Sequence, residues 1–189
     1  MLSRRQFVTG SAATLAAMTH LPARAAAVLT DDGLYREPWF IDSLLELADD
    51  LGDAAKSGKR LAIMWELRGC PYCRETHFVN FARADIADYV RQHFDILQLN
   101  ILGDREVTDF DGQKLSEKKL AHKYLIRGTP TFQFFPDRAD GLAAKAPRER
   151  EVLRTQGYLL PEDFKRSFRF VAERAYERMS FRDYLRAQS

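Results

Sequence analysis

The feature that most constrains the fold of this chain is a pair of cysteines separated by two residues, Cys70-Pro71-Tyr72-Cys73. They are the only cysteines among 189 residues, and this spacing lets the two thiols meet across one helical turn. The apolar run 60–66 before them suits a buried strand, and Gly69 supplies a turn between the two segments. Apolar residues then recur at intervals of three and four over 78–93, which indicates an amphipathic helix. The sequence therefore predicts a strand, a turn and a helix, with the cysteines where the helix begins.

The start of this helix gives the two cysteines different chemistry. Pro71 falls near the first helical position, which proline favours, so Cys70 is expected at the helix N-terminus. There the unpaired N–H groups and the helix dipole stabilise the thiolate, which is the nucleophilic form of cysteine. Cys73 lies about one turn further in and is expected to be more buried, which suits the resolving thiol. We therefore predict a catalytic dithiol in which Cys70 attacks; a structural disulfide or two reduced core cysteines are the alternatives.

A second motif lies some sixty residues later, in the segment Arg127-Gly128-Thr129-Pro130-Thr131. A proline cannot donate a hydrogen bond to a sheet, so Pro130 is expected at the first residue of a strand, at an edge or at a bulge. Together with the cysteine motif, the segment resembles the R-G-x-P-T loop of the thioredoxin superfamily, whose proline is cis and lies against the active-site disulfide. The resemblance implies that the Thr129-Pro130 bond is cis and that the backbone of Thr129 pairs with an extended substrate peptide.

The remaining segments predict a complete domain. Apolar spacing favours a helix over 38–56, strands are expected at 95–102, 131–135 and 151–156, and Asp111-Gly112 indicates a hairpin or turn. Ser116 and Pro161 each begin a further helix. This order matches a thioredoxin fold, which is an α/β single domain whose central mixed sheet has helices on both faces. The resemblance covers about residues 38–179.

Several features are similar to one subfamily, the periplasmic thioredoxins of bacterial sulfur-oxidation systems (the SoxW type). They are the segment W-E-x-x-G-C-P-Y-C from Trp65, the insertion 104–115, the R-G-T-P-T loop, and Gly157-Tyr158 before a long aromatic helix. This resemblance implies a protein-disulfide oxidoreductase with no cofactor. It also implies sulfur-oxidation proteins as clients, and a membrane thiol-electron donor of the CcdA or DsbD type.

Residues 1–25 resemble an export signal. The segment Ser3-Arg4-Arg5-Gln6-Phe7 is similar to a twin-arginine signal, the apolar stretch 7–18 is too short to cross a bilayer, and Ala23-Arg24-Ala25 fits a cleavage site. Val8-Thr9 departs from the best twin-arginine pattern, so Sec export stays open. We therefore predict a periplasmic protein with a linker at 26–37, the thioredoxin-like domain at 38–179 and a C-terminal tail at 180–189.

The charge balance points away from nucleic acid as a partner. Three of the 29 basic residues lie in 1–25, so 26 remain against 27 acidic ones, a net charge of −1. The alternating run Arg148-Glu149-Arg150-Glu151 is expected to be a solvated surface, and 137–147 a polar insertion. We expect a monomer.

Glu66 is the candidate for moving the proton of the resolving thiol. Many thioredoxins carry a buried aspartate six residues before the first cysteine, where this chain has Met64. Glu66 lies on the same face of the strand, two residues on, and burial would raise its pKa toward neutrality. A solvent-facing acid at the strand's end is the alternative, and the sequence leaves both open. Trp65 points to the opposite face and is expected in the core.

Two other functions stay open as alternatives. One is a DsbA-like oxidant or a DsbC-like isomerase, although residues 26–51 are too short for the dimerisation domain of such an isomerase and the large helical insertion of an oxidant is missing. The other is copper or zinc handling, because His77 follows Cys73 by four residues and the three side chains could share a helix face. Structural zinc normally needs a second ligand pair. We therefore predict no metal, and a surface position for His77.

Overall fold

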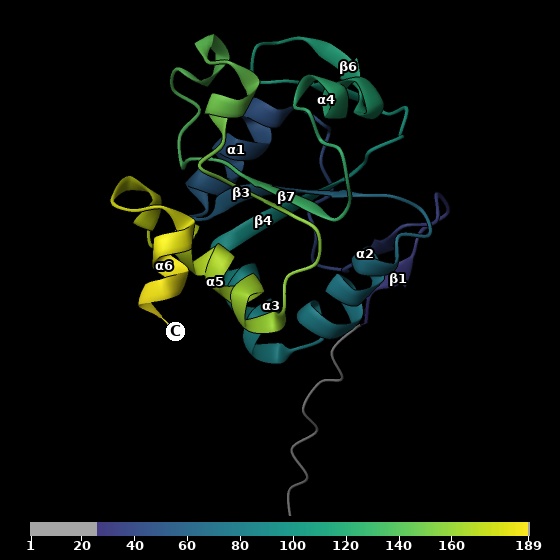
Figure 1. Cartoon of the computed structure of the whole chain (residues 1–189). Helices are drawn as coiled ribbons and strands as arrows, with labels where there is room; N and C mark the ends of the chain where they lie inside the picture. Colours follow the sequence, from purple (N-terminus) through teal and green to yellow (C-terminus); the bar gives the residue numbers. More distant parts are fainter. Residues whose placement is uncertain (1–25, 189) are drawn as a thin grey trace, which may run out of the picture.

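A computed structural model gives the structure of the chain and describes residues 26–188 (Figure 1). Its centre is a four-stranded sheet in the order β4-β3-β7-β8. The strands cover Arg60–Glu66 (β3), Phe94–Asn100 (β4), Thr131–Phe134 (β7) and Leu153–Gln156 (β8). β3 pairs in parallel with β4 and antiparallel with β7, and β7 pairs antiparallel with β8. This arrangement confirms the predicted α/β fold with a central mixed sheet. The predicted export signal 1–25 lies outside the described residues.

Helices cover both faces of this sheet (Figure 1). Helices α1 (Leu47–Lys56) and α4 (Glu117–Lys123) pack on one face, and α3 (Ala84–His93) and α5 (Pro161–Ala172) pack on the other. The shorter elements are β1 (Val28–Leu29), β2 (Tyr35–Arg36), α2 (Pro71–Glu75), a π-helical turn η1 (Thr76–Phe81), β5 (Glu106–Thr108), β6 (Lys114–Ser116), the 3-10 turns Leu142–Ala144, Pro147–Arg150 and Ala175–Glu177, and α6 (Phe181–Ala187). Within residues 26–188, none of the helices is long and apolar enough to span a bilayer.

The central strand β3 joins two hydrophobic cores. Successive side chains of a strand point to opposite faces, so Ala62 and Met64 pack with α3 and α5, while Ile63 and Trp65 pack with α1 and α4. Trp65 is fully buried, as predicted, and its Nε1 donates a hydrogen bond to Gln133 of β7. The strand that leads to the cysteines is therefore packed on both faces and hydrogen-bonded to a neighbouring strand along both edges.

The predicted helix 38–56 is wrong in its first half, because helix α1 begins only at Leu47. Residues before it run along the sheet: the Ile41 N–H donates to the Ile96 carbonyl, and the Leu45 carbonyl accepts from the Thr108 N–H. Leu45 has a left-handed φ of 64°, and Leu44 is 93 % exposed. The apolar residues at 40–46 have helical spacing, but their backbone groups bond to distant strands and not to one another. These bonds satisfy the backbone groups that a helix would otherwise pair.

The single helix predicted up to His93 is also divided. Helix α2 continues into the π-helical turn η1, which ends at Phe81, and α3 begins after Arg83. The Arg83 backbone is extended, and its carbonyl accepts from the N–H groups of Ile86 and Ala87. The Arg83 side chain also pairs with Glu162 of α5. The unbroken apolar pattern therefore does not reveal that one helix ends at Phe81 and another begins at Ala84.

The hairpin and the cap predicted around 104–120 are confirmed. β5 and β6 pair antiparallel around a turn in which Gly112 has a φ of 77°. Ser116 is the N-cap of α4, and its Oγ accepts from the Lys119 N–H at 3.4 Å.

Both segments outside the predicted domain differ from expectation, because each has buried side chains. The expected linker 26–37 contains the paired strands β1 and β2, and Leu34 and Glu37 within it are buried. The expected tail 180–189 contains α6, whose Tyr184 is buried against Phe170 with the ring centroids 5.2 Å apart.

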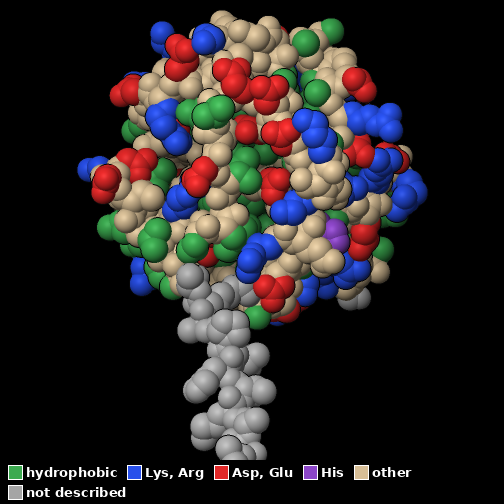
Figure 2. Space-filling view, turned by 180° about the vertical axis from the view of Figure 1, so that it is seen from behind, with side chains coloured by type: hydrophobic (Ala, Val, Ile, Leu, Met, Phe, Trp, Pro, Cys, Tyr) green, Lys and Arg blue, Asp and Glu red, His purple; other side chains and the backbone are tan. Residues whose placement is uncertain are grey.

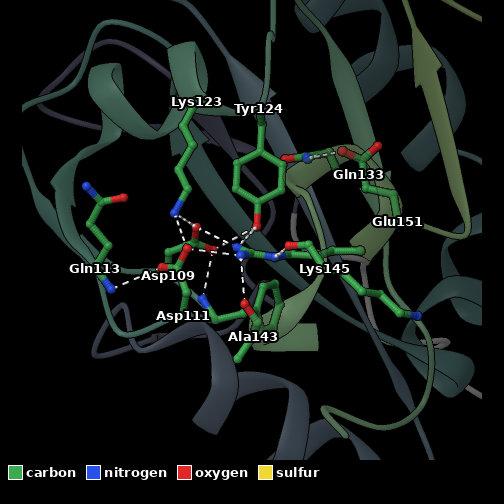
Figure 3. Close-up of polar contacts among 11 residues, drawn as sticks. Asp109, Asp111, Gln113, Lys123, Tyr124, Gln133, Ala143, Lys145 and Glu151 are labelled. Carbon is green, nitrogen blue, oxygen red and sulfur yellow. Dashed lines mark hydrogen bonds and ion pairs between the residues drawn. The ribbon is translucent and has the colours of Figure 1, made fainter. Parts of the chain in front are cut away.

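A buried polar network contradicts the expectation that Arg150 is a solvated surface residue (Figure 3). Arg150 is 3 % exposed, and its Nη1 donates to Asp109 Oδ2 at 2.8 Å and to the Tyr124 hydroxyl at 3.0 Å. Its Nη2 donates to Asp111 at 2.9 Å, and Lys123 pairs with both aspartates. The network therefore connects the hairpin, α4 and the segment before β8. On the face shown in Figure 2, by contrast, acidic and basic side chains are interspersed.

Candidate active site

The two cysteines form a disulfide at the start of α2. Cys70 is the N-cap residue, Pro71 is the first helical residue, and Cys70 Sγ accepts a hydrogen bond from the Cys73 N–H at 3.1 Å. The Cα atoms of the cysteines are 5.3 Å apart. Cys70 is half-buried whereas Cys73 is 2 % exposed, so only Cys70 has an accessible sulfur-bearing side chain of the kind that an attacking thiol needs.

The turn before Cys70 depends on Gly69. Its φ of 73° lies in the left-handed region, which glycine adopts without steric cost, and the Cys70 N–H donates to the Leu67 carbonyl at 3.1 Å. This tight turn redirects the chain from the end of β3 into α2. Tyr72, between the cysteines, is 57 % exposed and lies on the surface around the disulfide.

The Thr129-Pro130 peptide bond is cis, as the resemblance implied. Thr131 pairs with Trp65, so Pro130 lies at the carboxyl end of β3, where the turn to Cys70 also begins. The Pro130 carbonyl accepts from the Gly157 N–H at 2.8 Å. Thr129 is half-buried, and within residues 26–188 its backbone N–H and carbonyl have no hydrogen-bond partner. An extended peptide could therefore pair with Thr129 beside the cysteine loop.

Two residues that the sequence analysis did not select, Asn80 and Tyr158, connect the two motifs. Tyr158 follows Gly157, and its ring stacks on Tyr72 with centroids 6.4 Å apart and 16° between the planes. Its hydroxyl donates to Asn80 Oδ1 at 3.2 Å, and Asn80 Nδ2 donates to the Leu159 carbonyl at 3.0 Å. Gly157-Tyr158 entered the sequence analysis only as a subfamily feature, and the isolated Asn80 gave no signal.

Glu66 and His77 lie in the interior, and this resolves one open question and corrects one prediction. Glu66 is 1 % exposed, so the solvent-facing alternative is wrong. His77 is 2 % exposed, so its predicted surface position is wrong too. His77 Nε2 lies 3.1 Å from Glu66 Oε1, and His77 Nδ1 lies 3.0 Å from Glu37 Oε1. Two carboxylates bracket one imidazole, and this pairing makes its burial possible.

The electrostatics of this cluster favour a charged imidazole. Burial opposes the charge on His77, but the hydrogen bonds and charges of Glu37 and Glu66 outweigh it and raise the pKa of His77 to about 9. At neutral pH the ring therefore carries two protons and donates to both carboxylates. With its nitrogens occupied in this way, His77 does not offer a metal ligand to the cysteines. Over residues 26–188, no group of three His, Cys, Asp or Glu side chains is arranged to hold a metal ion.

This fold, with a disulfide at a helix start and a cis-proline at the adjoining strand end, defines a thioredoxin-fold protein with a redox-capable cysteine pair. A family model described as a thioredoxin-like domain matches residues 47–172, about two thirds of the chain. The chain therefore belongs to the thioredoxin-like domain family.

Three solved structures are similar to this chain, and the first of them supports the fold. A thioredoxin-fold protein from Helicobacter pylori is 17 % identical with a TM-score of 0.58, over 79 % of this chain and 91 % of that one. A thioredoxin from Thermus thermophilus is 22 % identical with a TM-score of 0.47, over 65 % and 81 %. The C-terminal domain of DsbD from Neisseria meningitidis is 14 % identical with a TM-score of 0.42, over 66 % and 92 %. A search of curated protein sequences gives no match.

Proposed function

We propose that this protein is a periplasmic thiol-disulfide oxidoreductase that reduces disulfides of client proteins through Cys70 and Cys73. The observation that carries the proposal is the disulfide at the N-terminus of α2, with Cys70 accessible and Cys73 buried. The cis-Pro130 loop beside it supplies an unpaired backbone edge at Thr129 for a client segment. No organic cofactor takes part.

The reduction proceeds in two exchanges. The Cys70 thiolate attacks one sulfur of the client disulfide, a bond forms between these two sulfurs, and the other client sulfur leaves as a thiolate. Cys73 then loses its proton and attacks Cys70 Sγ, so that the Cys70–Cys73 disulfide forms and the remaining client sulfur leaves. The client gains two electrons and, after protonation, two thiols. The protein is left oxidised.

The compartment determines what must return the electrons. The periplasm is kept oxidising, so a reductase there needs two electrons from outside after each cycle. We propose a membrane thiol-electron donor of the CcdA or DsbD type, and sulfur-oxidation proteins as clients. Both follow from the family resemblance of the W-E-x-x-G-C-P-Y-C segment and its neighbours. Export through the twin-arginine-like segment or the Sec route brings the chain to that compartment.

The reduction potential of the cysteine pair tests the direction of the reaction. The protein without residues 1–25 is equilibrated in dithiothreitol and glutathione buffers, its thiols are alkylated, and the products are counted by mass. We expect a potential near about −270 mV, as in thioredoxin, whereas a potential near about −120 mV, as in DsbA, would mean an oxidant. A pair that cannot be cycled would overturn the proposed function.

Two variants serve as controls for the roles of the cysteines. A Cys73→Ser variant should retain insulin, used as a model disulfide substrate, as a mixed disulfide on Cys70. A Cys70→Ser variant should retain much less, because Cys73 is buried. Equal trapping by both variants would contradict the assigned order of attack.

A further inference from the structure

An open pocket lies beside the cis-Pro130 loop, on the side away from the disulfide's own residues. Its volume is about 400 Å³. The residues that line it, here called the arginine pocket, are Leu125, Arg127, Arg148, Arg154 and Gln156. Three of them carry a guanidinium group, and within residues 26–188 no carboxylate belongs to the lining. The lining therefore favours an anionic group.

One of the three arginines is already neutralised by a buried carboxylate. The Arg154 side chain is 9 % exposed, its Nε donates to Glu151 Oε2 at 2.8 Å, and its Nη2 donates to the other oxygen of the same carboxylate. Glu151 also accepts from the Gln133 amide of β7 at 2.8 Å (Figure 3). Arg154 and Glu151 thus form a floor under the arginine pocket that has no net charge.

The other two arginines leave positive charge on the surface. Arg148 is 57 % exposed, and its Nη1 lies 3.7 Å from Glu151 Oε2, an oxygen that already accepts from Arg154. Arg127 is exposed, and its guanidinium has no partner in the part of the chain that the structure describes. Three guanidinium groups and one carboxylate give the pocket and its floor a net charge of +2. This excess charge is available to an anionic group of another molecule.

Leu125 gives the arginine pocket an apolar wall. The residue follows the C-cap of α4 and has a left-handed φ of 56°, a conformation that glycine usually supplies at this position. A side chain with a Cβ makes this conformation unfavourable, and Leu125 is 52 % exposed, so little burial offsets the cost. Its carbonyl accepts from Arg154 Nη1 at 3.5 Å. An exposed apolar side chain beside two guanidinium groups suits a ligand that is acidic and partly apolar.

The arginine pocket adjoins the backbone edge that the proposed function assigns to the client. Arg127 precedes Thr129 by two residues, and an extended chain rises only about 3.3 Å per residue. Gln156 pairs with Thr131, and its amide lies over Gly128, because a Cβ on Gly128 would be 3.0 Å from Gln156 Nε2. A client segment paired with Thr129 would therefore have neighbouring residues within reach of the pocket.

We propose that the arginine pocket binds an acidic segment of the client protein beside the disulfide that is reduced. This inference rests on the proposed function and names its substrate class, which is disulfides flanked by aspartate or glutamate with an apolar neighbour. The client carboxylates pair with Arg127 and Arg148, and the apolar side chain covers Leu125. Backbone pairing at Thr129 accepts many sequences, so the charged pocket supplies the selectivity.

Single-turnover reduction of matched peptides tests this substrate class. The peptides have the same length and one internal disulfide, which is flanked by acidic residues, by the corresponding amides or by lysines. The reduced protein is mixed with excess peptide and quenched with acid, its thiols are alkylated, and the products are counted by mass. At low salt we expect the second-order rate constant to be about tenfold higher for the acidic peptide than for the amide peptide, because complementary charge favours association. At 1 M NaCl, where charges are screened beyond about 3 Å, this ratio should fall below about twofold.

Variants of the two exposed arginines locate the preference. In Arg127→Gln/Arg148→Gln the ratio at low salt should fall from about tenfold to below about twofold. In Arg127→Glu/Arg148→Glu the lysine peptide should become the fastest, a reversal that altered folding would not produce. Arg91→Gln/Arg182→Gln is the matched control and should keep the preference. Both of its arginines are exposed, on α3 and α6, which pack on the face of the sheet away from α4.

The outcomes separate this inference from the proposed function. Equal rates for the acidic and amide peptides at low salt would overturn the inference and leave the proposed function intact. A preference that survives in Arg127→Gln/Arg148→Gln would overturn the inference as well, because the acidic segment would then bind elsewhere. If the natural protein reduces none of the peptides, the proposed function itself fails.

Discussion

Individual buried charges in this protein are held by partners far away in the sequence. Arg150 meets Asp109, 41 residues earlier, and His77 meets Glu37, 40 residues earlier. Each ion is taken out of water at a large cost, which only close opposite charges and hydrogen bonds offset. Removing one partner therefore leaves an uncompensated charge in the interior.

We expect Arg150→Met to lower the free energy of unfolding by about 3 kcal/mol, because Asp109 and Tyr124 would lose a buried donor and Asp109 would keep only Lys123 as its counter-charge. Urea denaturation of the oxidised protein measures the change. Arg148→Met is the matched control, since the Arg148 side chain is 57 % exposed, and its loss should stay below about 1 kcal/mol. Equal losses in the two variants would mean that the network in Figure 3 does not stabilise the fold.

At the scale of secondary-structure elements, the site is assembled where two connections meet. One leads from β3 through Gly69 to α2, and the other leads from β8 through Gly157 to α5. Gly157 has a φ of 82°, and its N–H holds the Pro130 carbonyl. The stacking of Tyr158 on Tyr72 then fixes the second connection against the cysteine loop.

Gly157→Ala is expected to destabilise the protein by about 1–2 kcal/mol, the cost of a Cβ in a left-handed conformation. Insulin reduction should slow by more than this stability loss explains, because a displacement of about 1 Å at a reacting site costs up to about 10² in rate. Gly52→Ala is the control: Gly52 lies inside α1 with open space around it, so the change should stabilise by about 0.5–1 kcal/mol. Unaltered reduction by Gly157→Ala would show that this turn does not position the Pro130 loop.

At the scale of the whole molecule, helix α6 stabilises a part of the core that is remote from the cysteine pair. Helix α6 lies at the opposite end of the fold from α2 (Figure 1). Its Phe181 and Tyr184 rings cover Phe170, with centroids 5.3 and 5.2 Å away. The expected tail is therefore part of the core on the α5 side of the sheet.

A chain that ends at Met179 is expected to lose about 2–4 kcal/mol of unfolding free energy, because two aromatic side chains no longer cover Phe170. Thermal or urea unfolding measures this loss. The reduction potential of the cysteine pair should stay the same, since no α6 residue lies near α2 (Figure 1). An Arg182→Ala variant controls for the exposed face of α6 and should change little. A shifted potential in the shortened chain would show that α6 affects the site.

The sequence by itself determined the local parts of this protein. The strand at 60–66, the turn at Gly69, the helix start at Cys70, the hairpin at Asp111-Gly112 and the cap at Ser116 all follow from neighbouring residues, because hydrogen bonds and dihedral preferences act within a few positions. The thioredoxin fold and the cis bond at Pro130 came from the resemblance that these motifs carry.

Only the tertiary structure decided which polar groups are inside. The predicted helix 38–56 begins only at Leu47, because the residues before it pair with distant strands. His77, Arg150, Leu34 and Glu37 are buried where the sequence indicated surface or linker. A charged side chain becomes an interior group only when its counter-charge arrives from elsewhere in the fold, and spacing along the chain does not encode that meeting. The pairing of Glu37 and Glu66 with His77 is therefore decided by the tertiary structure.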